Sequence, residues 1–281
     1  MSKLPLAALG QRHHFQVADS SRDPMALIRL WVTPVRIYLM RRAKSGKLIQ
    51  LSEFRNELGQ SPGDFLKSVL EAEPSCQQPA LERELILTET PISILPQAWV
   101  HDLTPARAAQ LVISPFAAAG NVIFFPEQDT DWGALMVQTR NWTDTLNGYW
   151  PEYKIRHAAG LVWESLNSIV SQEEKTFWVQ ILEERTLLIA AKEHNKLRLL
   201  NTYHCRDEAD RPYFVQAVRE VLGWQQEEIS VLCAGELSQA PPPGWLKWEG
   251  LRPTAPRSLL RPWPNSLAHT PWWRYICLLV K

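Results

Sequence analysis

The stretch FWVQILEERTLLIAAKEHNKLRLLNTY, residues 177–203, contains three short runs of apolar and β-branched side chains separated by a few polar residues. Such runs are typical of β-strands, and the short breaks are typical of turns between antiparallel strands. A helix predicted at 207–223 follows, ends at Gly223, and has an apolar face formed at helical spacing by Phe214, Val218, Val221 and Leu222. A fourth strand is predicted at 228–235.

The same order of elements occurs earlier in the chain. Three strand-like runs at 26–32, 35–42 and 47–54 precede a helix predicted at 61–73, which Ser61 and Pro62 are suited to begin, and a strand at 84–89. Coincidence is one explanation, since such units are common in α/β proteins, but the matched spacing favours an internal duplication. Superposing 26–89 on 177–235 should then give the same strand order.

The rest of the chain is predicted to add further elements. They are strands at 91–100, 121–127, 133–139 and 152–159, and helices at 141–150 and 159–170. The segment 240–273 is rich in proline, which disfavours helix and central strand, and it contains five of the 13 tryptophans. We expect most tryptophans to seal the core, with one or two exposed as interface candidates. A closing strand is predicted at 274–280.

Composition limits the classes of function. The 281 residues include 30 Lys and Arg against 30 Asp and Glu, so the chain has no overall basic surface for nucleic acid or acidic lipid. Gly10 ends the first apolar stretch, so no signal peptide is predicted. The longest apolar stretch, 111–125, is interrupted by Pro115 and Gly120, so no membrane span is predicted. Four widely spaced cysteines predict reduced thiols and no metal site. We expect a cytoplasmic protein.

Several stretches resemble an uncharacterised bacterial family, domain-of-unknown-function family 3822, placed in the actin-like ATPase fold near the pilus-assembly protein PilM. These stretches are ISILPQAWV, LNGYWPEYKIRHAAGLVWESL, KLRLLNTYHCRDEADRPYFVQAVREVLG, ISVLCAGELS and YICLLV. The resemblance implies an α/β, actin-like (ribonuclease H-like) duplicated fold of two lobes, each with a mixed five-stranded sheet and helices. The lobes are expected at 1–155 and 156–281, the second with the Pro/Trp-rich segment 240–273. No activity is implied by the family.

The resemblance also defines where a nucleotide would bind. Actin-like ATPases hold phosphate and hydrated Mg²⁺ with glycine and aspartate in the turn between the first two strands of each unit. Here the first turn, 32–35, lacks both, and Pro34 has no backbone N–H. The second turn, 182–185, has Glu183 and Glu184 but no glycine. Of the two glycines that usually end the adenosine strand only Gly235 is present, so we expect Gly235 to be a structural turn.

No residue is predicted to be catalytic or to bind a metal. His157 is expected to be packed and hydrogen-bonded rather than an acid–base group, and adjacent His13 and His14 would point to opposite sides of a strand. The sequence predicts a non-catalytic actin-like-fold protein that acts through a protein partner without a cofactor. The alternative is an ATP-binding, degenerate site in which Glu183 or Glu184 holds Mg²⁺ and Gly235 contacts the adenosine. Nucleic-acid binding through stacked tryptophans is disfavoured by the balanced charge.

Overall fold

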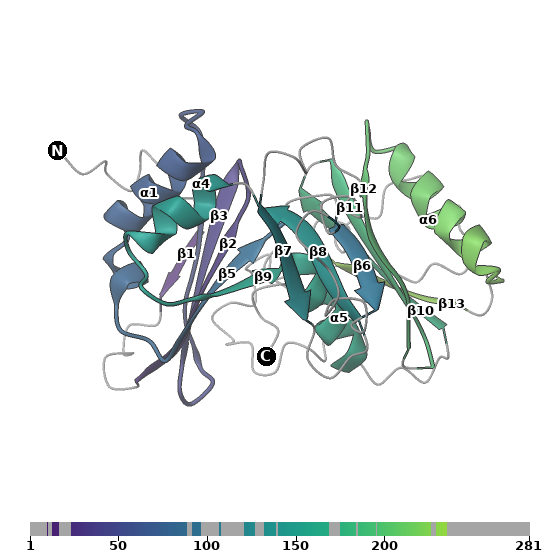
Figure 1. Ribbon diagram of the computed structural model, residues 1–281, viewed down its shortest axis with the longest axis horizontal. Helices are drawn as coiled ribbons and strands as arrows, with labels where there is room; N and C mark the ends of the chain where they lie inside the picture. Colours follow the sequence, from purple (N-terminus) through teal and green to yellow (C-terminus); the bar gives the residue numbers. More distant parts are fainter. Residues whose placement is uncertain are drawn as a thin grey trace.

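The protein was studied as a computed structural model of the 281-residue chain. The structure describes residues 10, 13–16, 24–88, 92–96, 107, 121–126, 132–138, 140–168, 175–183, 185–194, 196–225 and 229–234. Two β-sheets stand side by side with a third, smaller sheet and a helix between them (Figure 1).

The first sheet has six strands in the order β1-β4-β3-β2-β5-β9. The pairs from β1 to β2 are antiparallel, whereas β2-β5 and β5-β9 are parallel. The strands β2 to β5 have buried, mostly apolar positions on both faces, as expected for a covered sheet. Their bounds are β1 His13–Gln16, β2 Met25–Val32, β3 Arg36–Ala43, β4 Leu48–Arg55, β5 Glu82–Leu87 and β9 Lys154–His157.

Two helices cover the outer face of this sheet (Figure 1). The helix α1, Pro62–Ala72, begins where the Ser61 side chain accepts a hydrogen bond from the backbone N–H of Asp64. A short 3₁₀ turn at Pro74–Gln77 follows it, and α4, Arg140–Asn147, packs beside it. Beyond α4, the fully buried Trp150 donates from Nε1 to the carbonyl of Cys76 at 2.9 Å. This indole bond ties the chain after α4 to the 3₁₀ turn.

The second sheet has four strands in the order β12-β11-β10-β13. The helix α6, Asp210–Leu222, covers its outer face, and α5, Ala158–Ser168, packs against its inner face (Figure 1). Gly223 closes α6 with a φ of 66°, a left-handed conformation that glycine adopts readily. The strands are β10 Lys175–Glu183, β11 Thr186–Glu193, β12 Lys196–His204 and β13 Ile229–Ala234.

The strand order β4-β3-β2-β5 in the first sheet is repeated as β12-β11-β10-β13 in the second. In both sheets two antiparallel pairs are followed by one parallel pair. A helix precedes the last strand of each set along the chain: α1 lies between β4 and β5, and α6 lies between β12 and β13. The predicted repeat of strand order is therefore confirmed. Five strands were expected in each sheet, whereas the described sheets have six and four. The additional strand of the first sheet is the edge strand β1. The strand predicted at 274–280 lies outside the described residues.

A three-stranded antiparallel sheet, in the order β6-β8-β7, comes from the chain between β5 and α4. Trp132 of β8 contacts Trp163 of α5 edge to face at 6.1 Å between ring centroids, and β6 lies beside β12. The small sheet therefore packs against elements of the second half of the chain. Its strands are β6 Ile92–Pro96, β7 Asn121–Pro126 and β8 Trp132–Gln138.

Two clusters of buried side chains form the core. The larger one joins residues of both large sheets, including Leu30, Trp163, Trp178 and Leu200, and the smaller one lies between the second sheet and α6. On α6 the side chains that pack inward are Phe214, Val215, Val218 and Leu222, whereas Val221 is exposed because it lies on the flank of that face. All seven described tryptophans are buried, which confirms the sealing role for them.

Candidate functional site

The β2–β3 turn occupies the position at which the first phosphate contact was expected. Thr33 is almost fully buried and closes the turn: its backbone N–H and Oγ1 donate to the carbonyl of Arg36 at 2.8 and 3.0 Å. Its Oγ1 also accepts from the backbone N–H of Arg36 at 2.9 Å. Pro34 has no N–H to offer. The backbone donors of Thr33 and Arg36 are therefore used within the turn, and neither is turned outward toward an anion.

The loop between β4 and α1 holds this turn from the side. The backbone N–H of Asn56 donates to the carbonyl of Val35 at 3.0 Å, and Asn56 Nδ2 lies 3.2 Å from the carbonyl of Pro34. The same Nδ2 donates to Gln60 at 2.8 Å, which fixes the loop to the start of α1. Val35 and Leu58 are 51% and 57% exposed on this end of the sheet, so the position carries apolar surface where a phosphate site would need donors.

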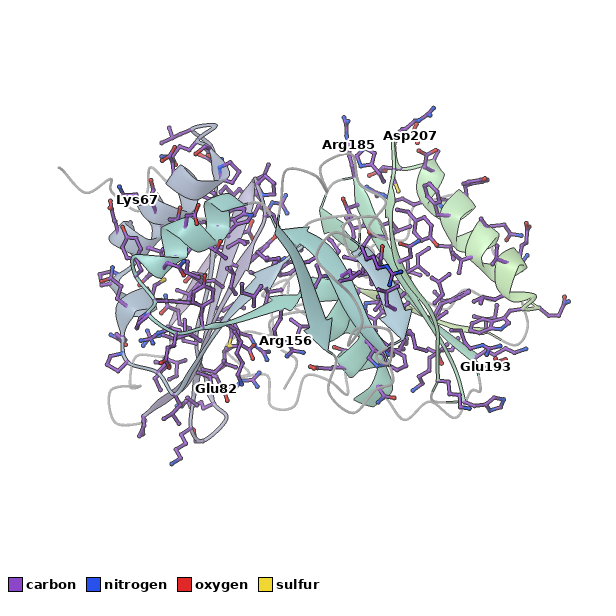
Figure 2. All side chains as sticks on the ribbon, viewed as in Figure 1. Lys67, Glu82, Arg156, Arg185, Glu193 and Asp207 are labelled. Atoms are coloured by element: carbon purple, nitrogen blue, oxygen red, sulfur yellow. The ribbon has the colours of Figure 1, made fainter. Side chains whose placement is uncertain are left out.

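The β10–β11 turn is the second expected position. Glu183 is the last residue of β10 and pairs with Thr186 after an irregularity in the ladder. Arg185 belongs to the turn and its carbonyl accepts from the backbone N–H of Cys205 at 2.7 Å. Figure 2 shows Arg185 at the same end of the second sheet as Asp207, and Glu193 at the other end. Glu184 and Gly235 lie outside the described residues, so the alternative nucleotide site formed by Glu183, Glu184 and Gly235 stays a prediction.

The carboxyl ends of the parallel strands β2, β5 and β9 form the edge at which ligands bind in open α/β sheets. Thr88, directly after β5, is buried and its Oγ1 lies 3.5 Å from the carbonyl of Val32. His157, the last residue of β9, is 1% exposed, and its Nδ1 accepts from the backbone N–H of Ala159 at 3.0 Å. The imidazole therefore satisfies a donor in the first turn of α5. This confirms the packed, hydrogen-bonded His157 expected from the sequence.

A charged and aromatic cluster lies beside the β2–β3 turn on the inner face of the first sheet. The ladder places Trp31, Tyr38, Glu53, Arg36 and Arg55 on this face. Glu53 is fully buried, and its Oε1 is 3.0 Å from Arg55 Nε and 3.9 Å from Arg36 Nε. The Trp31 and Tyr38 rings pack at 4.9 Å between centroids. Arg36 Nη1 lies 3.5 Å from the Tyr38 hydroxyl.

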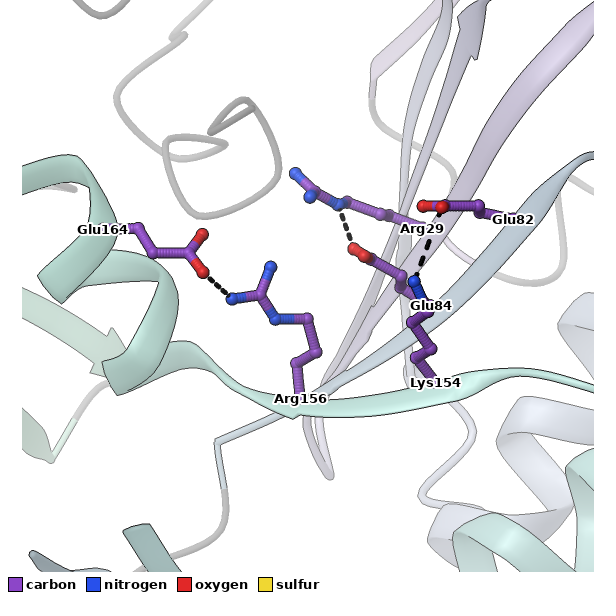
Figure 3. A network of polar contacts seen from close by, with 6 residues as sticks. All are labelled: Arg29, Glu82, Glu84, Lys154, Arg156 and Glu164. Carbon is purple, nitrogen blue, oxygen red and sulfur yellow. Dashed lines mark hydrogen bonds and ion pairs between the residues drawn. The ribbon is translucent and has the colours of Figure 1, made fainter. Parts of the chain in front are cut away.

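A second polar network lies on the same face farther from the turn, between β2, β5, β9 and α5 (Figure 3). Arg29 Nε donates to Glu84 Oε2 at 2.5 Å, and both side chains are buried. Arg156 is hydrogen-bonded to Glu164 of α5, and Lys154 pairs with Glu82 at 3.4 Å on the exposed margin. Burial, and then the charge of Arg29, lowers the pKa of the neighbouring Arg42.

These ion pairs were not predicted from the sequence. The available signal was weak: an arginine in the apolar run ALIRLWV and a glutamate in ELILTE, each at a position that a covered strand would bury. Their pairing depends on the parallel register of β2 and β5. The arrangement holds each buried charge against an opposite one, which is typical of structural ion pairs rather than of acid–base chemistry.

The described thiols are unsuited to nucleophilic chemistry. Cys76, Cys205 and Cys233 are free and buried. Burial raises the pKa of all three thiols, that of Cys233 to about 12, so the thiolate is disfavoured at neutral pH.

Among the described residues no group of three or more His, Cys, Asp or Glu is placed to hold a metal ion. No helix in that part of the chain is long and apolar enough to cross a membrane.

Comparison with known proteins gives a family and a fold. A family model with the description "Protein of unknown function (DUF3822)" matches residues 38–241. A Bacteroides thetaiotaomicron protein with actin-like ATPase fold and unknown function superposes with a TM-score of 0.70 at 15% identity, covering 79% of this chain and 87% of that one. The similarity shows that the chain has the actin-like ATPase fold.

More distant structures are also similar. The cytoplasmic domain of EpsL, an inner membrane component of the type II secretion system of Vibrio cholerae, has a TM-score of 0.44 at 8% identity, over 74% of this chain and 82% of that one. A Streptococcus pneumoniae ROK family protein in complex with sucrose has a TM-score of 0.39 at 11% identity, over 80% and 84% of the two chains. No curated protein sequence matches the chain.

Proposed function

This chain belongs to the family described as "Protein of unknown function (DUF3822)", and from that premise we propose that it is a non-catalytic member of the actin-like fold that acts through a protein partner. It works without a cofactor and in the cytoplasm. A relation to PilM, which the sequence suggested, is part of the same proposal.

The β2–β3 turn is the observation that carries the proposal. A phosphate group needs several outward N–H donors or a metal ion, and glycine lets the backbone come close enough to supply them. Here the N–H groups of Thr33 and Arg36 are bonded within the turn, and Pro34 has none. The exposed side chains of Val35 and Leu58 at this position favour contact with another protein, since exposed apolar side chains are common at interfaces.

The alternative function is nucleotide binding by a degenerate site. It would use Glu183 or Glu184 to hold Mg²⁺ and Gly235 to approach the adenosine, so that the second lobe alone would bind the phosphates. Two adjacent carboxylates repel phosphate unless a divalent cation lies between them. This alternative therefore requires Mg²⁺, and the proposed function requires no ligand at all.

A thermal unfolding scan with and without Mg²⁺ and ATP separates the two. A ligand at a hundred times its dissociation constant contributes about 2.7 kcal/mol, which raises the Tm of a protein of this size by roughly 5 °C or more. We expect no shift with ATP, with ADP or with either nucleotide in EDTA. An increase in Tm that needs Mg²⁺ and is lost in the double variant Glu183→Ala, Glu184→Ala would establish the alternative.

Gly235 is tested in the same scan. If it only turns the chain after β13, Gly235→Ala lowers the free energy of unfolding by roughly 1 kcal/mol or more, equally with and without Mg²⁺ and ATP. A variant with unchanged Tm that nevertheless loses a nucleotide or partner would instead place Gly235 in a binding site. The scan therefore also tests the structural role predicted for this glycine.

A further inference from the structure

Positive charge is concentrated at the end of the first sheet where β3 turns into β4. Four of the seven residues 41–47 are basic and none is acidic, although the chain as a whole is neutral. The tip of this hairpin, residues 44–47, is exposed. Within the described part of the chain the side chains of Lys44 and Lys47 make no hydrogen bond or ion pair. Two uncompensated lysines therefore stand at this end of the sheet.

Hydrogen bonds within the hairpin and to its neighbour fix the backbone that carries these lysines. The backbone N–H of Ala43 donates to the carbonyl of Lys47, and that of Gly46 donates to the carbonyl of Ala43, both at 2.9 Å. Gly46 has a φ of 84°, which glycine adopts without strain. The N–H of Lys44 donates to the carbonyl of Pro24 at 2.9 Å, so the hairpin is joined to the start of β2.

The loop before β5 places an apolar side chain at the same end of the sheet. Leu81 is 70% exposed, and its backbone N–H lies 3.4 Å from the carbonyl of Met25, the residue after Pro24. Gln78 of the same loop is hydrogen-bonded through its side chain to Arg41 of β3. Leu81 is therefore exposed on a loop that is fixed at both of these points.

We propose that this end of the first sheet, formed by Lys44, Lys47 and Leu81, docks on the surface of an anionic lipid bilayer. An apolar side chain that enters the boundary between headgroups and acyl chains, with lysines at the level of the lipid phosphates, is typical of peripheral membrane binding. The long lysine stems let the ammonium groups stay at the headgroups while the leucine is buried. The inference goes beyond the proposed function, because it concerns the surface on which the protein works.

The neighbouring acidic side chain does not cancel this charge. Glu82 directly follows Leu81 and is exposed, but its Oε1 lies 3.4 Å from Nζ of Lys154. The negative charge of Glu82 is therefore compensated within the protein, whereas the positive charges of Lys44 and Lys47 are not. An anionic surface would be attracted to this end of the sheet.

The side-chain types favour lipid over two other anionic partners. Lysine is depleted at protein interfaces, where arginine and aromatic residues are enriched, and both exposed cations of the hairpin tip are lysines. Tight nucleic-acid binding uses many phosphate contacts, and single strands also need aromatic side chains for stacking. The exposed apolar residue here is the aliphatic Leu81. Acyl chains accept an aliphatic side chain, whereas bases gain little from it.

The test measures co-sedimentation of the full chain with large unilamellar vesicles. One set consists of phosphatidylcholine alone, and the other of equal parts phosphatidylcholine and phosphatidylglycerol. We expect binding to the anionic vesicles that weakens as salt is raised, because salt screens the lysines from the lipid. Lys44→Gln and Lys47→Gln should each lower the partition coefficient about fivefold. Leu81→Ser should lower it about tenfold, since a buried leucine is lost.

Two variants of the same lobe serve as matched controls. Lys67→Gln makes the same charge change on the exposed face of α1, away from Glu82 and the neighbouring Leu81 (Figure 2). Leu58→Ser removes a leucine that is 57% exposed in the loop after β4, at the opposite end of the sheet from the β3–β4 hairpin. Both should bind the anionic vesicles as the wild type does, and thermal scans confirm that every variant is folded.

Three results would overturn the membrane surface. They are no binding to anionic vesicles, equal binding to both vesicle types, and an equal loss in Lys67→Gln or Leu58→Ser. Release from the vesicles by poly-uridylate at matched ionic strength, with affinity for this RNA that depends on the two lysines and not on Leu81, would assign the site to nucleic acid and also overturn the proposal. The nucleotide scan tests the proposed function independently of these outcomes.

Discussion

At the scale of single residues, Lys192 shows how a buried charge is set against a polar partner group. Lys192 of β11 is 3% exposed, and its Nζ donates at 3.1 Å to the carbonyl of Leu166 in the last turn of α5. A cation at this end of a helix is favoured by the helix dipole and satisfies a carbonyl that the helix leaves open. Burial nevertheless lowers the pKa of Lys192 from its ordinary 10.5, since the charged form loses its hydration.

The lowered pKa of Lys192 predicts a pH dependence of stability. Between the folded-state pKa and 10.5 the unfolded chain binds the proton more tightly than the folded one, so the free energy of unfolding rises with pH across this window. In Lys192→Met this contribution should disappear. The measurement is a series of urea melts from neutral pH to about pH 10, taking the difference between wild type and variant. Parallel curves for the two proteins would contradict the prediction.

At the scale of elements, the β2–β3 turn shows how a short segment replaces a glycine loop by side-chain hydrogen bonds. Thr33 stands at the end of β2 with its hydroxyl both donating to and accepting from the backbone of Arg36. These hydrogen bonds close the turn, whereas many two-residue hairpin turns depend on a glycine in a left-handed conformation. Pro34 also restricts the unfolded chain at this position. The turn is thereby closed by hydrogen bonds between its own residues.

Thr33→Val tests this role of the hydroxyl. The variant keeps the shape and strand preference of the side chain but leaves the Arg36 backbone N–H without its acceptor, so it should lower the free energy of unfolding by about 1–3 kcal/mol. Thr186→Val is the control at the start of β11, where the side chain makes no hydrogen bond among the described residues. It should change stability by less than about 0.5 kcal/mol. Denaturant melts measure both, and equal effects would show that the hydroxyl of Thr33 has no special part in the turn.

At the scale of the whole molecule, the larger core connects both large sheets. Its members include Leu30 and Leu70 on the side of the first sheet, Trp163 of α5, and Trp178 and Leu200 of the second sheet. The chain passes from β9 of the first sheet directly into α5, which packs on the second. The strand β9 also spans the predicted lobe boundary at 155/156, which stays a prediction. A core shared in this way couples the unfolding of the two sheets.

Coupling between the sheets predicts a single cooperative unfolding transition. Leu70→Ala removes a fully buried side chain of α1 and should cost about 2–5 kcal/mol. We expect hydrogen exchange measured by mass spectrometry to lose protection to the same extent in β3 and in β11, although β11 belongs to the other sheet. Tyr213→Ala, at an exposed position of α6, should change neither. A loss confined to β3 would show that the sheets unfold separately.

Most helices and strands could be predicted from the sequence alone. Strand composition, turn residues and helix caps are short-range signals, so the elements at 26–89 and 177–234 were placed within a few residues of their observed bounds. The repeat of element order also predicted that both sheets would share one strand order. The four-residue strand β1 was missed, because a short polar segment such as HHFQ has no strand signal of its own and pairs only because the edge of β4 is available.

What the tertiary structure alone decided is which polar side chains meet. Arg29 and Glu84 are 55 residues apart, and the Arg36, Glu53 and Arg55 cluster depends on the register of β3 with β4. Local sequence shows that such residues lie in strands, but a register shift of one residue would move each of them to the opposite face. The register is set by the burial of apolar side chains over the whole sheet. The polar sites follow from that packing, and for this reason they could be read only from the folded chain.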